Sequence, residues 1–571
     1  MPEKMVIRKK IRKGVLIALV VLILAFIVYF LLIAVDHPPE VKDLSALETE
    51  RKKFGGNTYV IGNNWLRKSE SGLWEMYVEG EPFERGVAFG KLTEELLFYQ
   101  ETAFVEQIRE LVPSHGYLKF LKYFVAWFNR NLDKNITEEY KVEIYGTSFS
   151  CSPLYDFIGS GYQRQLNYHA AHDIGHALQG LNMVGCTSFS CWNDKSADST
   201  LLIGRNFDFY AGKKFAENKI VCFYKPSTGY KFMMISWADM IGVVSGMNEK
   251  GLTVTINASK SAIPGQASTP VTLLAREILQ YATTLDEAYA LAKKRKLFVS
   301  ESILVGSVKD GKSAIIEKSP HQYDMVYAET NQIVCANHFQ GEVFLNNKTN
   351  IENIRGSDSQ YRFRRINELL QQDRMIDVPD AVSILRNRQG IGGTSLGMGN
   401  PLAVNQLIAH HAVVFKPVKQ QVWVSTSPYQ LGKFVAYDLN KVFSTDIKQI
   451  IENQEIYVRE LTISADTFLY SKEYIGFTKY LEMTEKLKEY SKSRKTLPES
   501  FKSAYIQTNP QLYLTYFHLG RYYHDIRNYK QAYEYYQTAL SKEVAGIDKR
   551  NELIKLSGKT IKKIKNAHTG N

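Results

Sequence analysis

Residues 182–194 read "NMVGCTSFSCWND", and the fold assignment depends on the first cysteine of this stretch. Gly185 precedes Cys186, and Thr187 and Ser188 follow it. A structural cysteine acts as a small hydrophobic side chain and needs none of these neighbours. A cysteine that becomes a chain terminus does need such neighbours, because the glycine before it permits the strained backbone that a self-cleaving peptide bond requires. The stretch therefore favours cleavage between Gly185 and Cys186.

Cleavage at this bond would give Cys186 its own base. A thiol is a useful nucleophile only as the thiolate, so it needs a group nearby that takes the proton. A free α-amine has an ordinary pKa of about 7.7–8.0 and can do this at neutral pH. Nucleophile and base then belong to one residue, as in the N-terminal variants of the catalytic triad.

The composition is that of a globular protein with more than one structural unit. The chain has 571 residues, of which 44% are apolar and 23% are charged. Its net charge of +12 is concentrated near both ends, and an anionic membrane surface explains this better than nucleic acid, for which no binding motif is present. The cysteines show neither a paired CxxC nor a zinc spacing, and we expect no cofactor or metal. They are Cys151, Cys186, Cys191, Cys222 and Cys335.

Residues 14–34, "GVLIALVVLILAFIVYFLLIA", form an uninterrupted apolar run that is long enough to cross a bilayer as a helix. A cleaved signal peptide would have a shorter apolar core and a small-x-small site, so the run favours a signal anchor. The basic residues before it predict a cytoplasmic N-terminus. The rest of the chain is then expected on the extracytoplasmic side, periplasmic or luminal.

Composition and pattern divide the chain into five segments. They are a cytoplasmic basic tail (1–13), a transmembrane anchor (14–34), a stalk and helical pro-segment (35–185), a catalytic domain (186–446) and a helical C-terminal region (447–571). After Cys186, short strands joined by Gly and Asn turns alternate with helices. This pattern predicts a layered α+β domain with antiparallel hairpins and not a parallel doubly wound sheet.

The C-terminal region contains one unit with tetratricopeptide-like spacing, at about residues 512–545. A single unit cannot bury its own apolar face, so it must pack on a neighbour. The functional interpretation is a peptide-binding groove. Because only one unit is visible, the pattern favours a packing extension.

The motifs between about residues 77 and 440 resemble those of the N-terminal-nucleophile hydrolases. The similarity is greatest to the group of penicillin (isopenicillin N) acyltransferase, choloylglycine hydrolase and acid ceramidase. "GCTSF" followed by "GRNFDF" resembles the processed terminus of that group and the strand after it. Further elements follow the order of the family: "EGEPFERGVAFGKL", "GMNEKGLTVTINAS", "CANHF" and "QYRFRR". The resemblance implies a four-layer αββα sandwich and an N-terminal fragment that stays associated with the catalytic fragment.

The resemblance also assigns roles close to the nucleophile. Cys186 matches the residue that supplies the thiol and, through its released amine, the base. Arg205 and Asp208 match the pair that contacts the terminal cysteine. A neighbouring cation lowers the pKa of a thiol, and a carboxylate can orient an ammonium group. An ordinary ion pair on a strand is the structural alternative for Arg205 and Asp208.

Three further residues complete the expected site. Asn257 matches the side chain that binds the oxyanion together with a backbone N–H. It also lies in an Asn-Ala-Ser glycosylation sequon, and without the family match it would be interpreted as a turn residue. Asn337 matches a second asparagine near the nucleophile. Arg362 matches the closing arginine, although Arg364 and Arg365 leave the register open.

Two other patterns resemble functional motifs. Gly393–Gly397 is a formal match to the Gly-x-Ser-x-Gly elbow, but a helical pattern precedes it and not a strand, so we expect a loop. His169, His172 and His176 are spaced to lie on one face of a helix. No fourth ligand accompanies them, and a packed helix face is favoured over zinc.

Two functions from different classes remain. The first is a self-processing, membrane-anchored amidase or acyltransferase that acts on an N-acyl or lipid-like small molecule through an acyl-thioester on Cys186. The second is a non-catalytic scaffold protein that uses the tetratricopeptide-like region. The presence of all the expected site residues favours the enzyme, because a protein that had lost catalysis would not need to keep each of them.

Overall fold

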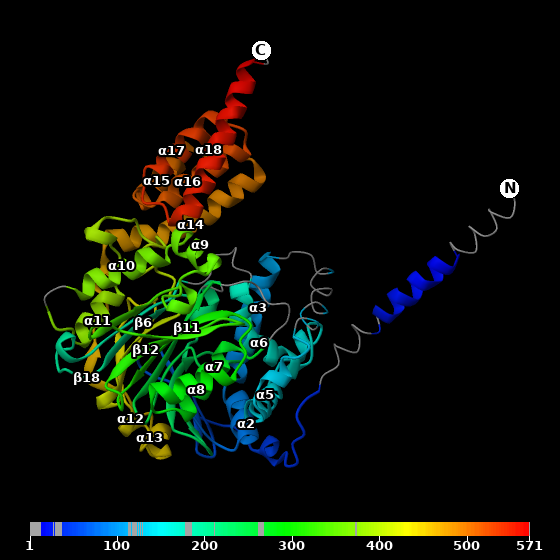
Figure 1. The fold of residues 1–571 in the computed structure, drawn as a ribbon, viewed down its shortest axis with the longest axis vertical. Helices are drawn as coiled ribbons and strands as arrows, with labels where there is room; N and C mark the ends of the chain where they lie inside the picture. Colours follow the sequence, from blue (N-terminus) through cyan, green and yellow to red (C-terminus); the bar gives the residue numbers. More distant parts are fainter. Residues whose placement is uncertain are drawn as a thin grey trace.

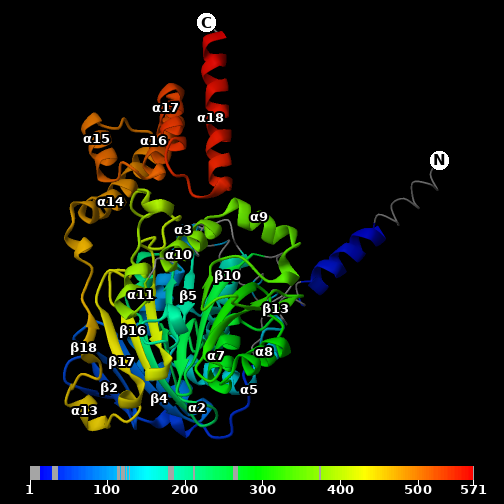
Figure 2. The same cartoon turned by 60° about the vertical axis from the view of Figure 1, so that its left-hand side comes forward.

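A computed structural model describes residues 13–26, 28, 37–111, 116, 123, 125, 127, 129–177, 185–209, 212–260, 268–371 and 374–569. Two β-sheets lie face to face at its centre, and helices cover the outer face of each (Figure 1). The order of layers is therefore helix, sheet, sheet, helix, as the sequence predicts. A separate group of helices follows at the C-terminus (Figures 1 and 2).

Among the described residues, the larger sheet has eleven strands and contains one parallel pair, β4 with β7. In spatial order its strands are β1 (Lys52–Phe54), β2 (Thr58–Ile61), β3 (Asn64–Lys68), β4 (Trp74–Gly80), β7 (Ile220–Pro226), β8 (Phe232–Ser236), β9 (Ser245–Asn248), β10 (Leu252–Ser259), β11 (Ser300–Ser307), β12 (Lys312–Lys318) and β13 (Tyr323–Tyr327). The other pairs are antiparallel hairpins and meanders, which is the expected α+β pattern.

The smaller sheet has seven strands, all paired antiparallel. Its spatial order is β14 (Gln332–Cys335), β5 (Thr187–Cys191), β6 (Leu202–Phe207), β15 (His411–Lys416), β16 (Gln421–Ser425), β17 (Phe434–Asp438) and β18 (Val458–Ile463). Cys186 directly precedes β5, so the candidate nucleophile lies at the start of an interior strand.

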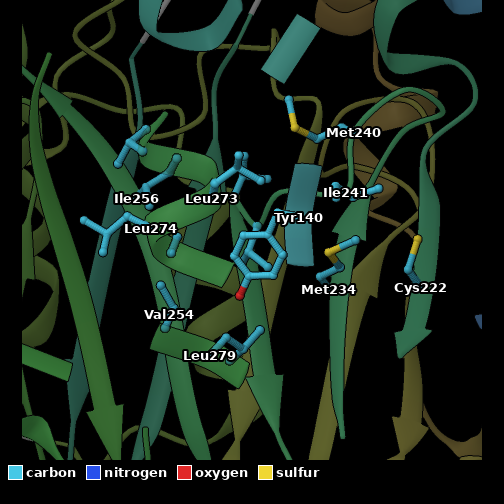
Figure 3. Close-up of a cluster of buried hydrophobic side chains, with 14 of the residues drawn as sticks. Tyr140, Cys222, Met234, Met240, Ile241, Val254, Ile256, Leu273, Leu274 and Leu279 are labelled. Carbon is cyan, nitrogen blue, oxygen red and sulfur yellow. The ribbon is translucent and has the colours of Figure 1, made fainter. Parts of the chain in front are cut away.

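Helices cover both outer faces. The larger sheet packs on α2 (Pro82–Leu92), α3 (Glu94–Leu111), α5 (Glu138–Ser148), α6 (Gly161–Ala177), α7 (Val271–Tyr281) and α8 (Leu285–Lys294). In this layer Val254 and Ile256 of β10 lie beside Leu273 and Leu274 of α7 (Figure 3). The smaller sheet packs on α10 (Ser359–Leu370) and α11 (Val378–Leu385), and α9 (Lys348–Gly356) precedes them.

The segment that we predicted to be a stalk and a helical pro-segment supplies four strands of the larger sheet, which corrects that prediction. Ile61 pairs with Asn64 across the two-residue turn Gly62–Asn63, a short hairpin connection that the sequence analysis missed. β4 then pairs with β7 over seven residues, from Trp74 with Ile220 to Gly80 with Pro226. Residues before the predicted cleavage bond are therefore part of the catalytic sheet.

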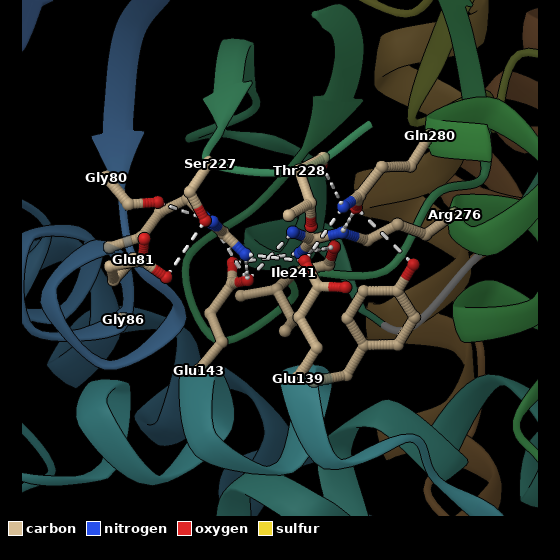
Figure 4. A network of polar contacts seen from close by, with 12 residues as sticks. Gly80, Glu81, Gly86, Glu139, Glu143, Ser227, Thr228, Ile241, Arg276 and Gln280 are labelled. Carbon is tan, nitrogen blue, oxygen red and sulfur yellow. Dashed lines mark hydrogen bonds and ion pairs between the residues drawn. The ribbon is translucent and has the colours of Figure 1, made fainter. Parts of the chain in front are cut away.

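A buried charge network also joins the two sides of that bond (Figure 4). Glu143 of α5 accepts hydrogen bonds from Arg85 of α2 and from Arg276 of α7. All three side chains are fully buried. α2 approaches α5 so closely that a Cβ on Gly86 would lie 2.0 Å from the carbonyl oxygen of Glu143, which explains the glycine in the "FERG" element.

Residues 13–26 are helical, and their apolar side chains are exposed, among them Leu16, Leu22 and Phe26. Within the described residues, no helix combines the length and apolarity needed to cross a membrane. Residues 27 and 29–34 of the predicted anchor lie outside the described residues. The transmembrane assignment stays a prediction.

The C-terminal region is mostly helical, but β18 lies within it and pairs with β17, so the smaller sheet extends past the predicted domain boundary at residue 446. After α12 (Leu439–Val442) and α13 (Ile447–Ile451), its helices are α14 (Lys472–Ser493), α15 (Glu499–Thr508), α16 (Tyr513–Asp525), α17 (Tyr529–Leu540) and α18 (Gly546–Thr569). Gly520 of α16 packs on Tyr536 of α17, where a Cβ would lie 2.5 Å from the ring. Leu396, Leu402 and Leu431 of the catalytic domain share the buried cluster of these helices, which fits a packing extension. The tetratricopeptide-like character itself is not confirmed.

Candidate active site

Cys186 is fully buried and belongs to the apolar cluster that the larger sheet forms with its covering helices. Its Sγ accepts a hydrogen bond from Nη2 of Arg205 at 3.7 Å and donates one to the carbonyl oxygen of Asp208 at 3.9 Å. Burial raises the pKa of the Cys186 thiol to about 11, against the opposing effect of the Arg205 cation. In the uncut chain the thiol is therefore neutral at pH 7 and depends on its neighbours for activation.

Arg205 bridges the two sheets at this point. It lies on β6 of the smaller sheet, and its guanidinium donates to backbone carbonyl oxygens of Val244 and Ile256 in the larger sheet. The guanidinium also lies over the ring of Phe207, at 4.4 Å from the centroid. Because it lies on one sheet and its guanidinium is bound by carbonyl oxygens from the other side, Arg205 holds a fixed cation against the thiol.

A chain of polar side chains extends from Arg205 away from the thiol. Nη1 of Arg205 donates to Oγ of Ser245, and Ser245 contacts Nε2 of His411 at 2.9 Å. His411 Nδ1 lies 2.9 Å from Nδ1 of His410. An arginine only donates, so the Ser245 hydroxyl can donate onward, with His411 as acceptor. In that arrangement, His411 carries its hydrogen on Nδ1, and His410 carries its hydrogen on Nε2.

Asp208 is fully buried one residue beyond the end of β6. Burial raises the pKa of this carboxyl to about 7, although Arg362 and Arg205 act in the opposite direction. Its Oδ2 accepts a hydrogen bond of 3.4 Å from Nε2 of Gln406. Its Oδ1 has no hydrogen-bond partner among the described residues. A buried carboxylate oxygen without a donor is suited to receive a new cation nearby.

Gly185 is held on both sides. Its N–H donates to the carbonyl oxygen of Asp208 at 2.9 Å, and its own carbonyl oxygen accepts from Nε2 of Gln406 at 2.8 Å. A Cβ on Gly185 would lie 2.5 Å from Nε2 and 2.8 Å from Oε1 of Gln406. The structure thus gives a reason for this glycine that differs from the expected backbone strain: a larger residue would displace Gln406.

Asn257 lies on β10 and faces the smaller sheet. Its Oδ1 accepts from Ser188 at 2.9 Å, and its Nδ2 donates to the carbonyl oxygen of Cys335 at 3.0 Å. This bond uses only one of the two Nδ2 hydrogens, so the amide keeps donor capacity. The side chain is fully buried, which answers the question raised by the sequon at this position.

Asn337 and Arg362 form a connected pair on the other side of β5. Nη2 of Arg362 donates to Oδ1 of Asn337 at 2.6 Å, and Asn337 Nδ2 donates to the carbonyl oxygen of Ala258 at 2.9 Å. Nε of Arg362 also donates to Oγ1 of Thr187, the residue next to the nucleophile, at 3.2 Å.

The neighbours of Arg362 point elsewhere, which decides the register. Arg364 is exposed. Arg365 bonds Asn387 and Glu368.

The structure therefore brings the predicted residues around one strand. Arg205 contacts the thiol directly, and Asp208 contacts it through its backbone. Asn257, Asn337 and Arg362 reach the same place through bonds to residues on or beside β5. The sequence analysis missed Ser245, His411 and Gln406. No local motif marks Gln406, which comes to the site from a loop more than 200 residues downstream.

His169 is a satisfied core residue. Its Nδ1 bonds the carbonyl oxygen of Gln165, and its Nε2 accepts from the N–H of Ile241. Both ring nitrogens are used within the protein, so His169 has none left for a metal. The side chains of His172 and His176 lie outside the described residues. In the described part of the chain, no cluster of His, Cys, Asp and Glu is arranged to hold a metal.

The Gly393–Gly397 elbow match is a loop, as predicted, and a short 3-10 turn at Ile391–Gly393 leads into it.

Part of the chain matches a known protein family. Residues 192–424 match the family described as acyl-coenzyme A:6-aminopenicillanic acid acyl-transferase. The matched region begins after Cys186 and includes the other predicted site residues Arg205, Asp208, Asn257, Asn337 and Arg362. The match confirms the resemblance to the N-terminal-nucleophile hydrolase group that the motifs indicated.

A curated relative and two solved structures are also similar. An uncharacterized protein of Archaeoglobus fulgidus is 26% identical over 284 residues, which cover 45% of this chain and 46% of the relative, so the chain spans about half the length of that relative. A Caenorhabditis elegans N-acylethanolamine-hydrolyzing acid amidase ortholog is 18% identical, with a TM-score of 0.30 over 41% of this chain and 93% of that chain. A mutant conjugated bile acid hydrolase from Clostridium perfringens is 14% identical, with a TM-score of 0.31 over 45% of this chain and 93% of that chain.

Proposed function

We propose that this protein is a self-processing cysteine amidohydrolase or acyltransferase of the N-terminal-nucleophile type. The observation that carries the proposal is the buried group at the Gly185–Cys186 bond. It combines a thiol in contact with Arg205 and a carboxylate, Asp208, that has an oxygen without a donor. The family match of residues 192–424 supports acyl chemistry at this site.

Self-cleavage would complete the site. The new α-amine of Cys186 would form where Gly185 and Asp208 are already in contact through their backbones. Asp208 Oδ1 is then the natural acceptor for the ammonium form of that amine, and the neutral form is the base that activates the thiol. A burial-raised thiol pKa in the precursor and an adjacent base in the product together explain why cleavage would switch the enzyme on.

The mature reaction follows from the positions of the side chains. The thiolate of Cys186 attacks the carbonyl carbon of an N-acyl substrate, and the amide nitrogen leaves with the proton that the thiol gave to the α-amine. Asn257 supplies a side-chain donor to the developing oxyanion; one such donor typically lowers the barrier by about 3–4 kcal/mol. Water or a second amine then takes the acyl group from the thioester. An N-acyl or lipid-like small molecule is the substrate class that we propose.

The two products of cleavage, residues 1–185 and 186–571, would remain one particle. The parallel β4–β7 pairing and the buried pair of Glu143 with Arg276 both connect residues on either side of the cut. The exposed apolar side chains of residues 15–26 support attachment of the N-terminal fragment to a membrane, with the catalytic region on the extracytoplasmic side.

The experiment that tests the proposal is intact-mass analysis and N-terminal sequencing of the purified protein beside Cys186→Ala. We expect two associated fragments in the wild type, the larger beginning Cys-Thr-Ser-Phe, and one uncut chain of 65.3 kDa in the variant. An uncut wild-type chain that releases no acyl group from a panel of N-acyl amines would favour the non-catalytic scaffold instead.

A further inference from the structure

Gln406 contacts the carbonyl oxygen of the bond that we propose is cut. Its Nε2 lies 2.8 Å from the oxygen of Gly185, which is hydrogen-bond distance. The side chain is 4% exposed, so water does not compete for this contact. Of the side chains that the sequence assigned to the site, none has this position: Asn257, the expected oxyanion donor, bonds Cys335 and Ser188.

Two contacts just before Gln406 attach its loop to neighbouring parts of the fold. The carbonyl oxygen of Val404 accepts from Asn206 Nδ2 at 3.0 Å, which attaches the loop to β6. The N–H of Asn405 donates to the carbonyl oxygen of Asn387 at 2.8 Å, which attaches it to the segment after α11. A donor fixed in this way needs no reorganisation when charge develops on its partner.

We propose that Gln406 is a catalytic residue of self-cleavage and donates from Nε2 to the Gly185 oxygen as negative charge develops there. This inference rests on the proposed self-processing. It assigns separate donors to two oxyanions: Gln406 to that of the chain's own Gly185 carbonyl, and Asn257 to that of an acyl substrate.

Self-cleavage passes through a thioester between Cys186 and Gly185. Sγ of Cys186 bonds to the carbonyl carbon of Gly185, and the oxygen becomes an oxyanion that accepts the Gln406 hydrogen bond. The carbon–nitrogen bond between Gly185 and Cys186 then breaks, and the thiol proton ends on the departing amine. Water hydrolyses the resulting thioester and restores the thiol. The products are the carboxylate of Gly185 and the ammonium group of Cys186.

The test follows cleavage of the full-length chain with time after cell-free synthesis at pH 8. Gln406→Met keeps the side-chain length and removes the donor, and we expect cleavage to slow about 100-fold, as for the loss of one oxyanion donor. Gln430→Met is the matched control, because Gln430 is also buried and donates to the carbonyl oxygen of Leu385 and not to that of Gly185. It should cleave at the wild-type rate.

Gln406→Glu gives a readout that a purely structural role would not produce. A glutamic acid donates only when protonated, so its cleavage rate relative to the wild type should rise as the pH is lowered from 8 to 5. Unfolding temperatures of Cys186→Ala with and without Gln406→Met show whether the substitution damages the fold without reference to cleavage.

The outcomes separate the two proposals. An uncut wild type, or cleavage in Cys186→Ala, would overturn self-processing itself. A wild type that cuts while Gln406→Met cuts equally fast would overturn the role of Gln406 alone. So would a Gln406→Glu rate that keeps a constant ratio to the wild type at every pH.

Discussion

Glu143 accepts two hydrogen bonds from Arg276, at 2.9 and 2.8 Å, and the two residues lie on opposite sides of the proposed cleavage bond. Both are fully buried, and Arg85 shares the same carboxylate. Removing one partner of such a pair leaves an uncompensated buried charge, which typically costs 3–5 kcal/mol.

Glu143→Ala should therefore weaken the association of the two fragments. We expect the free energy of unfolding to fall by about 3–5 kcal/mol, with the N-terminal fragment released at a lower urea concentration. Size-exclusion chromatography across a urea series measures this. Glu138→Ala removes a largely exposed carboxylate of the same helix, which pairs with Lys141, and is the matched control. Equal release in both variants would contradict the role of the buried pair.

Ser245 and His411 should act as positioning residues for Arg205. His411→Leu removes the acceptor of the Ser245 hydroxyl, so the hydroxyl loses its direction and the guanidinium loses a fixed partner. We expect about a tenfold lower rate of acyl release and alkylation of Cys186 that requires a higher pH. Iodoacetamide labelling followed by peptide mass analysis measures the second effect.

Two substitutions control this experiment. His411→Gln keeps an acceptor near the Nε2 position and should restore the wild-type pH midpoint. His518→Leu removes a half-buried histidine in the C-terminal helices and should leave the midpoint unchanged. A shift in His518→Leu as large as in His411→Leu would show a general loss of packing instead.

Acid should destabilise the protein through its buried histidines. Burial lowers the pKa of His169 to about 4, from an ordinary value of 6.5. Between these two values the unfolded chain binds a proton that the folded chain does not, so stability is complete above pH 6.5 and is lost as the pH falls towards 4. This one histidine accounts for roughly 3 kcal/mol. Urea unfolding at pH 7 and pH 5 should show a smaller loss in His169→Gln than in the wild type.

Asp208 should have the opposite effect on the precursor. Burial raises the pKa of its carboxyl to about 7, from 3.8, so the folded chain keeps a proton that the unfolded chain has lost. Its contribution to stability is present below pH 3.8 and is lost as the pH rises through 7. In the uncut Cys186→Ala chain, Asp208→Asn should therefore raise the free energy of unfolding at pH 8 by up to about 4 kcal/mol. No gain at pH 8, or the same gain at pH 5, would contradict this assignment.

The strands around Cys186 could be predicted from the sequence because their motifs combine local turns with ordered strands. "GMNEKGL" forms the β9–β10 hairpin, and "GRNFDF" places Arg205 and Asp208 at the end of β6. The contacts between segments were not readable in the same way. Gln406 and Ser245 lie in segments with no unusual composition, and only the packing of the two sheets brings them to Gly185 and Arg205.

Strands β1–β3 were not predicted, for a related reason. The strands between residues 52 and 68 are short, polar on one side and separated by turns, so their pattern alone resembles a connecting segment. β4 completes its pairing with β7, from which it is separated by more than 130 residues. A local pattern can predict each strand but not the partner with which it pairs, so this pairing was not readable from either segment.

Because β1–β4 belong to the larger sheet, cleavage would change the way the protein loses its folded structure. In the precursor, all eleven strands belong to one chain, so a strand that separates from the sheet can pair again at a rate that does not depend on protein concentration. After cleavage, four strands belong to one fragment and seven to the other. Reassembly would then be a bimolecular event between dilute partners, so the working lifetime of a cleaved protein would depend on the rate at which the two fragments separate.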